Sequence, residues 1–129
     1  MAKILVVDDD LDMCEIISDI LKEGGHTVNV SYNGEDALRK IKKDHYDLIV
    51  LDYRLGGISG LVVLEKALQT MPSLKIIMIS AFGSDSTKTK ARELGALDFI
   101  DKPFDIKRLI QAVQDTLTKN TADEKPKKE

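Results

Sequence analysis

Acidic, hydroxyl and basic side chains stand at or just after the ends of four short apolar runs. They are Asp8 and Asp9, Asp52, Ser80 and Lys102. Uninterrupted apolar runs are typical of strands buried in a parallel sheet, and open α/β folds place their chemistry at the carboxyl ends of such strands. The sequence therefore predicts that these side chains meet at one edge of a sheet.

Three of these side chains are carboxylates, which repel one another when they are brought together. A hard cation relieves this repulsion, and Mg²⁺ prefers an octahedral shell of oxygen ligands that includes several waters. We expect Asp9 and Asp52 to bind Mg²⁺, or Mn²⁺ in its place, directly and Asp8 to bind it through water. The backbone carbonyl of Arg54, just beyond the strand, would complete the protein's share of the ligands.

A carboxylate beside such an ion can act as a nucleophile toward a phosphoryl group and form an acyl phosphate. Asp52 is the candidate nucleophile, because it closes a buried apolar run at the mouth of the predicted sheet and the other strand-end residues can fill the remaining roles. Phosphoryl transfer depends on positioning and on neutralising the charge of the oxygens. Lys102 would supply a positive charge to one phosphoryl oxygen, and Ser80 would donate a hydrogen bond to another.

Segments with a helical period alternate with the apolar runs, which predicts a (βα)₅ chain. Strands are expected over residues 3–7, 27–31, 47–51, 75–79 and 98–101. Helices are expected over 11–23 and 61–70, after an N-cap at Asn33, from Ser84 or Asp85 to Leu94, and after an N-cap at Asp105. We predict a doubly wound, flavodoxin-like α/β fold with the parallel strand order 2-1-3-4-5, which sets the ends of the first and third strands side by side.

Composition indicates one globular domain over residues 1–118, followed by a charged tail over 119–129 that is expected to be disordered. The 129 residues are 43% hydrophobic and 32% charged, and the net charge of −3 favours neither nucleic acid nor an anionic membrane. No apolar stretch is long enough to span a bilayer. The lone Cys14 rules out an internal disulfide and is interpreted as a small buried side chain. A cytoplasmic protein is expected.

The motifs at the strand ends resemble the receiver domain of two-component response regulators. The resemblance covers residues 3–118 and rests on four motifs in order: Val6-Val7-Asp8-Asp9, Leu51-Asp52, Ser80-Ala81 and Lys102-Pro103-Phe104. Residues 93–106 are similar to stand-alone phosphorelay receivers of the sporulation type.

The resemblance implies a role for each matching residue. Asp52 would be the phosphoacceptor, Asp8 and Asp9 the acid pair that holds magnesium, and Lys102 the phosphoryl-binding lysine of a cis Lys-Pro bond. Ser80 would be the switch hydroxyl, and Phe99 the aromatic that turns inward when Ser80 bonds the phosphoryl group. Arg54 and Phe82 would flank the water that hydrolyses the acyl phosphate.

The resemblance also implies partners: a histidine kinase or a histidine phosphotransferase that donates the phosphoryl group, and a protein target downstream. An apolar surface for the donor is expected at Met13, Ile16, Pro103 and Phe104, although such a row on a helix is also typical of half-buried core. The basic side chains of the fourth helix (Lys88, Lys90 and Arg92) are expected to be solvated. No direct contact with nucleic acid or membrane is expected, and the chain would be a monomer or a weak dimer.

Two other functions fit parts of the sequence. A magnesium phosphatase with an aspartate nucleophile, similar to the haloacid-dehalogenase enzymes, would need an acid two residues after Asp52, where Arg54 stands. A flavodoxin-like cofactor protein would need a phosphate-binding loop after the first strand, where Asp8 and Asp9 would repel phosphate. The signalling module remains the preferred interpretation.

Overall fold

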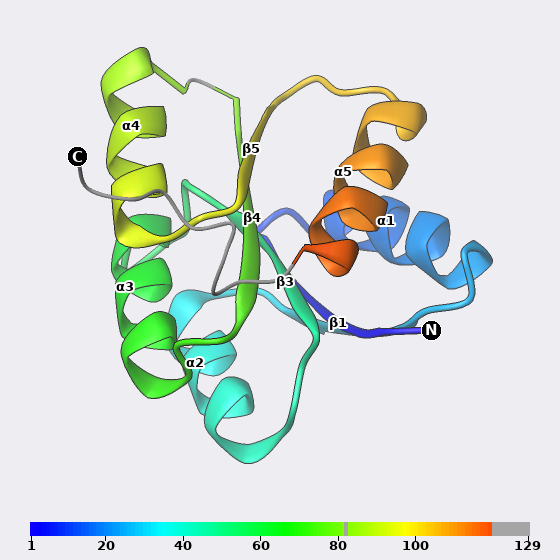
Figure 1. Ribbon diagram of the computed structural model, residues 1–129, viewed down its shortest axis with the longest axis horizontal. Helices are drawn as coiled ribbons and strands as arrows, with labels where there is room; N and C mark the ends of the chain where they lie inside the picture. Colours follow the sequence, from blue (N-terminus) through cyan, green and yellow to red (C-terminus); the bar gives the residue numbers. More distant parts are fainter. Residues whose placement is uncertain (82, 120–129) are drawn as a thin grey trace.

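Five strands and five helices alternate along the chain in the computed structural model, which describes residues 1–81 and 83–119 (Figure 1). The strands are β1 (Lys3–Val7), β2 (Thr27–Ser31), β3 (Leu48–Asp52), β4 (Lys75–Ser80) and β5 (Asp98–Asp101). The helices are α1 (Leu11–Glu23), α2 (Gly34–Lys43), α3 (Gly60–Thr70), α4 (Asp85–Leu94) and α5 (Ile106–Thr118). The (βα)₅ prediction is confirmed.

The strands form one parallel sheet in the order β2-β1-β3-β4-β5, as predicted. Helices α1 and α5 cover one face, and α2, α3 and α4 cover the other (Figure 1). Alternate strand residues point to opposite faces, so Leu5 and Val7 of β1 pack toward α2 and α3, whereas Ile4 and Val6 pack toward α1 and α5. Burial on both faces explains why β1, β3 and β4 have no polar alternation, whereas the partly exposed edge strand β2 alternates polar and apolar residues.

Two strands end one residue later than predicted. Asp52 is the last residue of β3, where it is paired in register with Ile79, and Ser80 is the last residue of β4, paired with Asp101. Pairing with a neighbouring strand extends each strand beyond its apolar run. Asp52 and Ser80 therefore have their backbones fixed by the sheet rather than by a loop.

Side-chain caps begin all five helices, and those at Asn33, Ser84 and Asp105 lie where the sequence predicts them. Asp10 accepts hydrogen bonds from the backbone N–H groups of Asp12 and Met13 and so begins α1. A cap satisfies N–H groups that have no partner within the helix. The other N-caps are Asn33, Ser59, Ser84 and Asp105.

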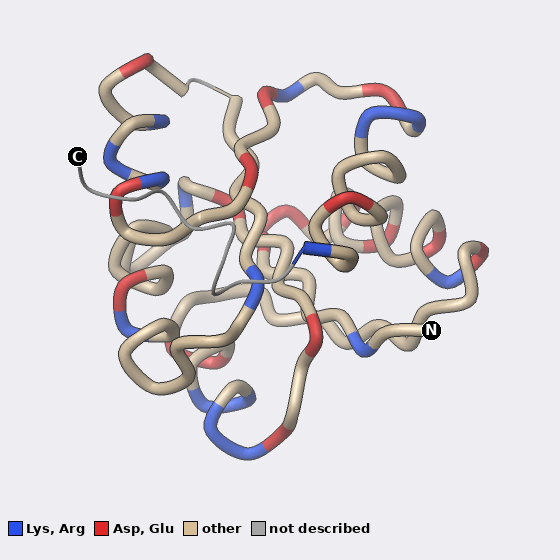
Figure 2. The backbone as a smooth tube through the Cα atoms, viewed as in Figure 1, with Lys and Arg blue, Asp and Glu red and all other residues tan. Residues whose placement is uncertain are grey.

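The predicted tail falls almost entirely outside the described residues, since only Lys119 of residues 119–129 is described. Lys119 follows α5 directly, and its ammonium donates to the carbonyl of Leu97. Figure 2 shows that basic and acidic residues are interspersed over the helices, which agrees with the small net charge. Within the described part of the chain, each helix is too short or too polar to cross a bilayer.

Candidate functional site

The candidate site lies at the carboxyl ends of the two central strands. Asp8 directly follows β1 and is fully buried, Asp52 ends β3 and is 4% exposed, and Asp9 is exposed. Each of the three carboxylates offers an oxygen, and these oxygens lie within 4.8 Å of one another. They line a hollow of about 550 Å³, together with Arg54 and Lys102. The predicted convergence of the acids is therefore present.

Lys102 reaches this cluster from the loop that follows β5. Its Nζ lies 3.1 Å from Oδ2 of Asp8 and 3.6 Å from Oδ1 of Asp52. The backbone N–H of Lys102 donates to the carbonyl of Ser80 at 2.7 Å, and the Lys102–Pro103 peptide bond is cis. The end of β4 thus anchors the backbone from which the ammonium extends.

Burial and crowding of charge disfavour the ionised form of Asp52. Desolvation, followed by repulsion from Asp8, raises the pKa of Asp52 to about 7, although Lys102 and the backbone N–H of Arg54 oppose the rise. For Lys102, burial lowers the pKa, but the negative charges of Asp52 and Asp8 outweigh it, so the pKa lies above its usual value. The carboxylates carry more negative charge than one lysine balances, which is the condition that favours a bound cation.

Gly60, at the start of α3, lies against the backbone of Asp52. A Cβ built on Gly60 would come 2.4 Å from the carbonyl oxygen of Asp52 and 2.7 Å from Cα of Tyr53. The N–H of Gly60 also donates to the carbonyl of Tyr53 at 2.9 Å. Glycine therefore allows α3 to pack directly on the turn after β3, a contact that the sequence analysis did not identify.

Cys14 of α1 and Asp10, the N-cap that precedes it, both donate hydrogen bonds to Asp8. The thiol of Cys14 donates to the backbone carbonyl of Asp8 at 3.2 Å, and the N–H of Asp10 donates to Oδ1 of Asp8 at 3.0 Å. Burial, followed by repulsion from Asp8, raises the pKa of Cys14 to about 11. The interpretation of Cys14 as a buried side chain is confirmed, but its hydrogen bond to the site was not foreseen.

The two predicted switch residues, on β4 and β5, do not line the hollow. Ser80 is 1% exposed, and its neighbour Ala81 lines the hollow instead. Phe99 of β5 is 5% exposed and packs in the core on the face covered by α2, α3 and α4. Phe82, the predicted neighbour of the hydrolytic water, lies outside the described residues. The switch roles of Ser80 and Phe99 stay predictions.

The predicted donor surface is brought together beside the acid cluster. Met13, Ile16, Pro103 and Phe104 line a shallow hollow of about 200 Å³ between α1 and the loop after β5. Ile16 is 52% exposed, so this row is not simply the edge of the core. Ile106, 56% exposed on α5, borders the same hollow and was not predicted.

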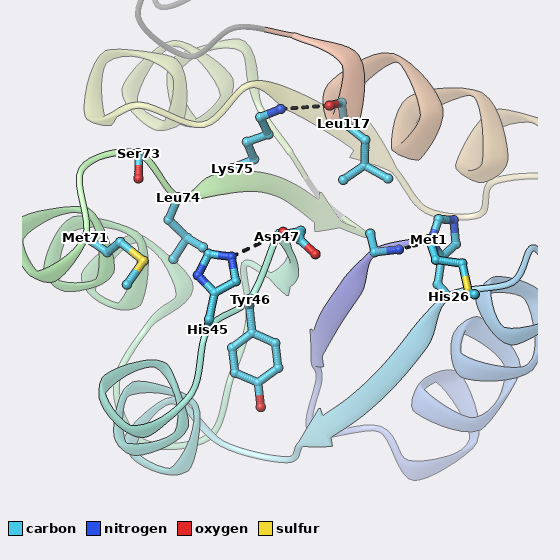
Figure 3. A pocket seen from close by; sticks show the side chains of 11 residues that line it. Met1, His26, His45, Tyr46, Asp47, Met71, Ser73, Leu74, Lys75 and Leu117 are labelled. Carbon is cyan, nitrogen blue, oxygen red and sulfur yellow. Dashed lines mark hydrogen bonds and ion pairs between the residues drawn. The ribbon is translucent and has the colours of Figure 1, made fainter.

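A further hollow of about 380 Å³ lies at the opposite, amino-terminal end of the strands (Figure 3). Its polar groups are largely paired: Nε2 of His45 lies 3.3 Å from Asp47, and Nζ of Lys75 donates to the carbonyl of Leu117 at 2.8 Å. Among the described residues, the acids of the first hollow form the one cluster with metal-ligand spacing. The amino-terminal hollow therefore does not compete with it as the candidate site.

Comparison with known proteins agrees with the geometry. A model of the response regulator receiver domain matches residues 4–114. Transcriptional regulatory protein ZraR of Salmonella typhimurium is 35% identical over 125 residues, which are 95% of this chain and 28% of that protein. The chain thus spans little more than a quarter of this relative's length.

Two other proteins match over nearly their whole length. Chemotaxis protein CheY of Bacillus subtilis is 38% identical over 116 residues, covering 89% of this chain and 97% of CheY. The crystal structure of a CheY-like receiver domain protein from Methanospirillum hungatei has a TM-score of 0.88 and 28% identity, with coverage of 91% and 94%. The chain belongs to the family of response regulator receiver domains.

Proposed function

We propose that the chain takes a phosphoryl group from a phosphohistidine side chain onto Asp52. One carboxylate oxygen of Asp52 forms a bond to phosphorus while the phosphorus–nitrogen bond breaks, and the electron pair returns to the imidazole, which takes up a proton. The observation that carries this proposal is the position of Asp52, a buried carboxylate at a strand end with Lys102 at 3.6 Å.

Mg²⁺, or Mn²⁺, fits the acid cluster. The spacing of the three carboxylate oxygens, within 4.8 Å, and the pKa of Asp52, raised by burial and by Asp8, both favour a divalent cation there. Asp8, Asp9, Asp52 and the backbone carbonyl of Arg54 would hold it. Such an ion supplies positive charge to the equatorial phosphoryl oxygens.

Lys102 and Ser80 would bind the transferred group. In the structure the ammonium of Lys102 is paired with Asp8 and Asp52, so phosphorylation offers it a new oxygen partner without a large movement. The hydroxyl of Ser80 would donate to another oxygen. Phosphorylation adds about −1.5 to −2 charges and three acceptor oxygens, and Phe99 would be the side chain that reports this change to the surface.

The donor would be a histidine kinase or a histidine phosphotransferase. The hollow formed by Met13, Ile16, Pro103 and Phe104 lies beside the acid cluster and is apolar, which suits a helical partner that presents a histidine. Downstream, the chain would act through a protein target. Because ZraR is a transcriptional regulator of which this chain spans 28%, a place within a larger regulator is one form that this output could take.

The direct test is incubation with a small phosphodonor and Mg²⁺, followed by intact mass spectrometry. We expect one added phosphoryl group in the parent protein and none in Asp52→Asn. Asp12→Asn, an exposed acid in the first turn of α1, is the matched control and should accept one group. Lack of an adduct in the parent, or an undiminished adduct in Asp52→Asn, would reject the proposal, and steady release of phosphate from small phosphoesters would favour the phosphatase alternative.

A further inference from the structure

The ring of Phe99 lies in a site that is shaped by a glycine of the loop after β4. A Cβ built on Gly83 would come 2.7 Å from Cε1 and 3.1 Å from Cζ of Phe99. The φ angle of Gly83 is not in the left-handed region. The methyl group of an alanine at residue 83 would therefore clash with the ring in its present position and press on the Asp101 carboxylate, whereas the backbone conformation there would accept an alanine.

A charged pair from two elements lies beside this site, and a Cβ on Gly83 would also come 3.3 Å from Oδ1 of Asp101. Nζ of Lys88, on α4, lies 5.8 Å from the centre of the Phe99 ring and 2.7 Å from Oδ2 of Asp101 on β5. Lys90 and Arg92 are exposed as expected, whereas the Lys88 side chain is only 26% exposed and is paired with Asp101. A cation over an aromatic face is attracted by the ring, and its ion pair with Asp101 fixes it there.

We propose that Lys88 is a positioning residue that, paired with Asp101, holds Phe99 inward before any phosphoryl group is bound. The ring edge lies against Gly83 and the ammonium lies over the ring, and the Lys88–Asp101 pair ties α4 to β5 beside it. In the unphosphorylated protein, the Lys88–Asp101 ion pair would then set the fraction of molecules in which the Phe99 ring points inward. Phosphorylation would act on a ring that is already in this position. The consequence for signalling rests on the proposed function, whereas the effect of Lys88 on the position of the Phe99 ring does not.

The hold can be measured by ¹⁹F NMR on protein labelled with 4-fluorophenylalanine, with the Phe99 signal assigned by Phe99→Leu. All variants are made in an Asp52→Asn background, so that phosphorylation cannot contribute. Lys88→Met keeps the aliphatic stem but removes the charge. Lys90→Met, an exposed lysine on the same helix, is the matched control. Gly83→Ala, whose methyl group would push the Phe99 ring out of its present position, supplies a reference signal for the outward ring.

We expect Lys88→Met to raise the population of outward ring by about two- to fivefold, a change typical of a partly exposed charge pair. The Phe99 signal should move toward that of Gly83→Ala, and Lys90→Met should leave it unchanged. Asp101→Asn should have an effect similar to Lys88→Met, and the double variant should differ little from either, because both remove one interaction. High salt should shift the parent signal but not that of Lys88→Met.

A Phe99 signal that is the same in parent and Lys88→Met would overturn the proposal, as would equal shifts from Lys88→Met and Lys90→Met. Circular dichroism identifies any variant that does not fold. If Gly83→Ala fails to fold, the salt dependence of the parent against Lys88→Met still decides the question. Because the background lacks the phosphoacceptor, these results stand apart from the mass-spectrometry test of phosphorylation at Asp52.

Discussion

The ammonium of Lys102 lies 3.1 Å from Oδ2 of Asp8, although 94 positions along the chain separate the two residues. The side chains are 17% and 1% exposed, so the pair is largely shielded from water. Breaking a buried pair by removing one partner leaves a charge uncompensated. The position of Lys102 should therefore matter for stability as well as for the phosphate binding proposed above.

Lys102→Met should lower the free energy of unfolding by about 1–3 kcal/mol in metal-free buffer, because Asp8 and Asp52 lose their shared cation. The loss should be smaller when Asp52→Asn is also present, since one of the two charges is then gone. Urea denaturation in EDTA measures both effects. Lys107→Met, an exposed lysine of α5, is the control, and a Lys102→Met protein as stable as this control would contradict the prediction.

Addition of Mg²⁺ should stabilise the parent protein by relieving repulsion within the acid cluster. The stabilisation should rise with the logarithm of the Mg²⁺ concentration above the dissociation constant. In Asp9→Asn, which removes one proposed ligand, the increase in melting temperature should be much smaller, and Asp12→Asn should keep it. NaCl at equal ionic strength serves as the control that separates Mg²⁺ binding from general screening of charge. An equal rise in melting temperature with Mg²⁺ in all three proteins would mean that the ion binds elsewhere.

Asp36 should make stability depend on pH in the acid range. Its carboxylate accepts from the hydroxyl of Ser31 at 2.7 Å, and this bond, with the contacts of Lys40 and Arg39, lowers the pKa of Asp36 to about 2 against the effect of burial. A carboxyl whose pKa is depressed on folding stabilises the protein above its unfolded pKa, near 4, and loses that contribution as the pH falls through 2.

The difference in unfolding free energy between the parent and Asp36→Asn should therefore be about 1–2 kcal/mol at neutral pH and shrink between about pH 4 and pH 2. Urea denaturation across this range measures the difference. Glu65→Gln, an exposed acid, should give a much flatter difference from the parent. A constant difference for Asp36→Asn over the whole range would mean that its hydrogen bonds do not favour the charged form.

Gly60→Ala should destabilise the protein by about 2–3 kcal/mol, because the new methyl group would clash with the backbone of Asp52 and Tyr53. Gly56→Ala is the matched control: its Cβ would meet Oδ2 of Asp9 only at 3.9 Å, so its stability should change little. Chemical denaturation and phosphorylation by a small donor should both distinguish the two variants. Equal stability would show that α3 can move away from β3 at little cost.

Ile16→Lys should slow phosphoryl transfer from a phosphohistidine protein while leaving uptake from a small phosphodonor unchanged. The side chain is exposed and borders the proposed donor surface, so the charge should weaken docking without unfolding the domain. Ile110→Lys changes an isoleucine that is 38% exposed on α5 and does not line this hollow. Transfer rates measured with the phosphohistidine protein and with the small phosphodonor separate docking of the donor from the chemical step. If Ile16→Lys and Ile110→Lys slow transfer equally, the apolar hollow is not the donor surface.

Much of this architecture follows from local patterns. Apolar runs and helical periods predicted every strand and helix, because burial on both faces of a parallel sheet leaves a clear signal in β1, β3 and β4. Asp8, Asp9 and Asp52 were found because each stands at the end of such a run. Their convergence required only the strand order.

What the sequence did not reveal depends on contacts between distant elements. The last residue of β3 is set by pairing with β4, so the apolar run alone places its end one residue early. Lys88 looked like a solvated lysine because its partner Asp101 lies 13 residues further along, on β5. The close packing of Gly60 on Asp52 likewise depends on where α3 lies in three dimensions.

The acids of the site come from the first half of the chain, and the lysine that balances them follows β5, near the end of the domain. A partly synthesised chain that stopped at β4 would hold three crowded carboxylates without the ammonium. If phosphorylation of Asp52 needs that ammonium, as proposed, a copy truncated before β5 would not accept a phosphoryl group.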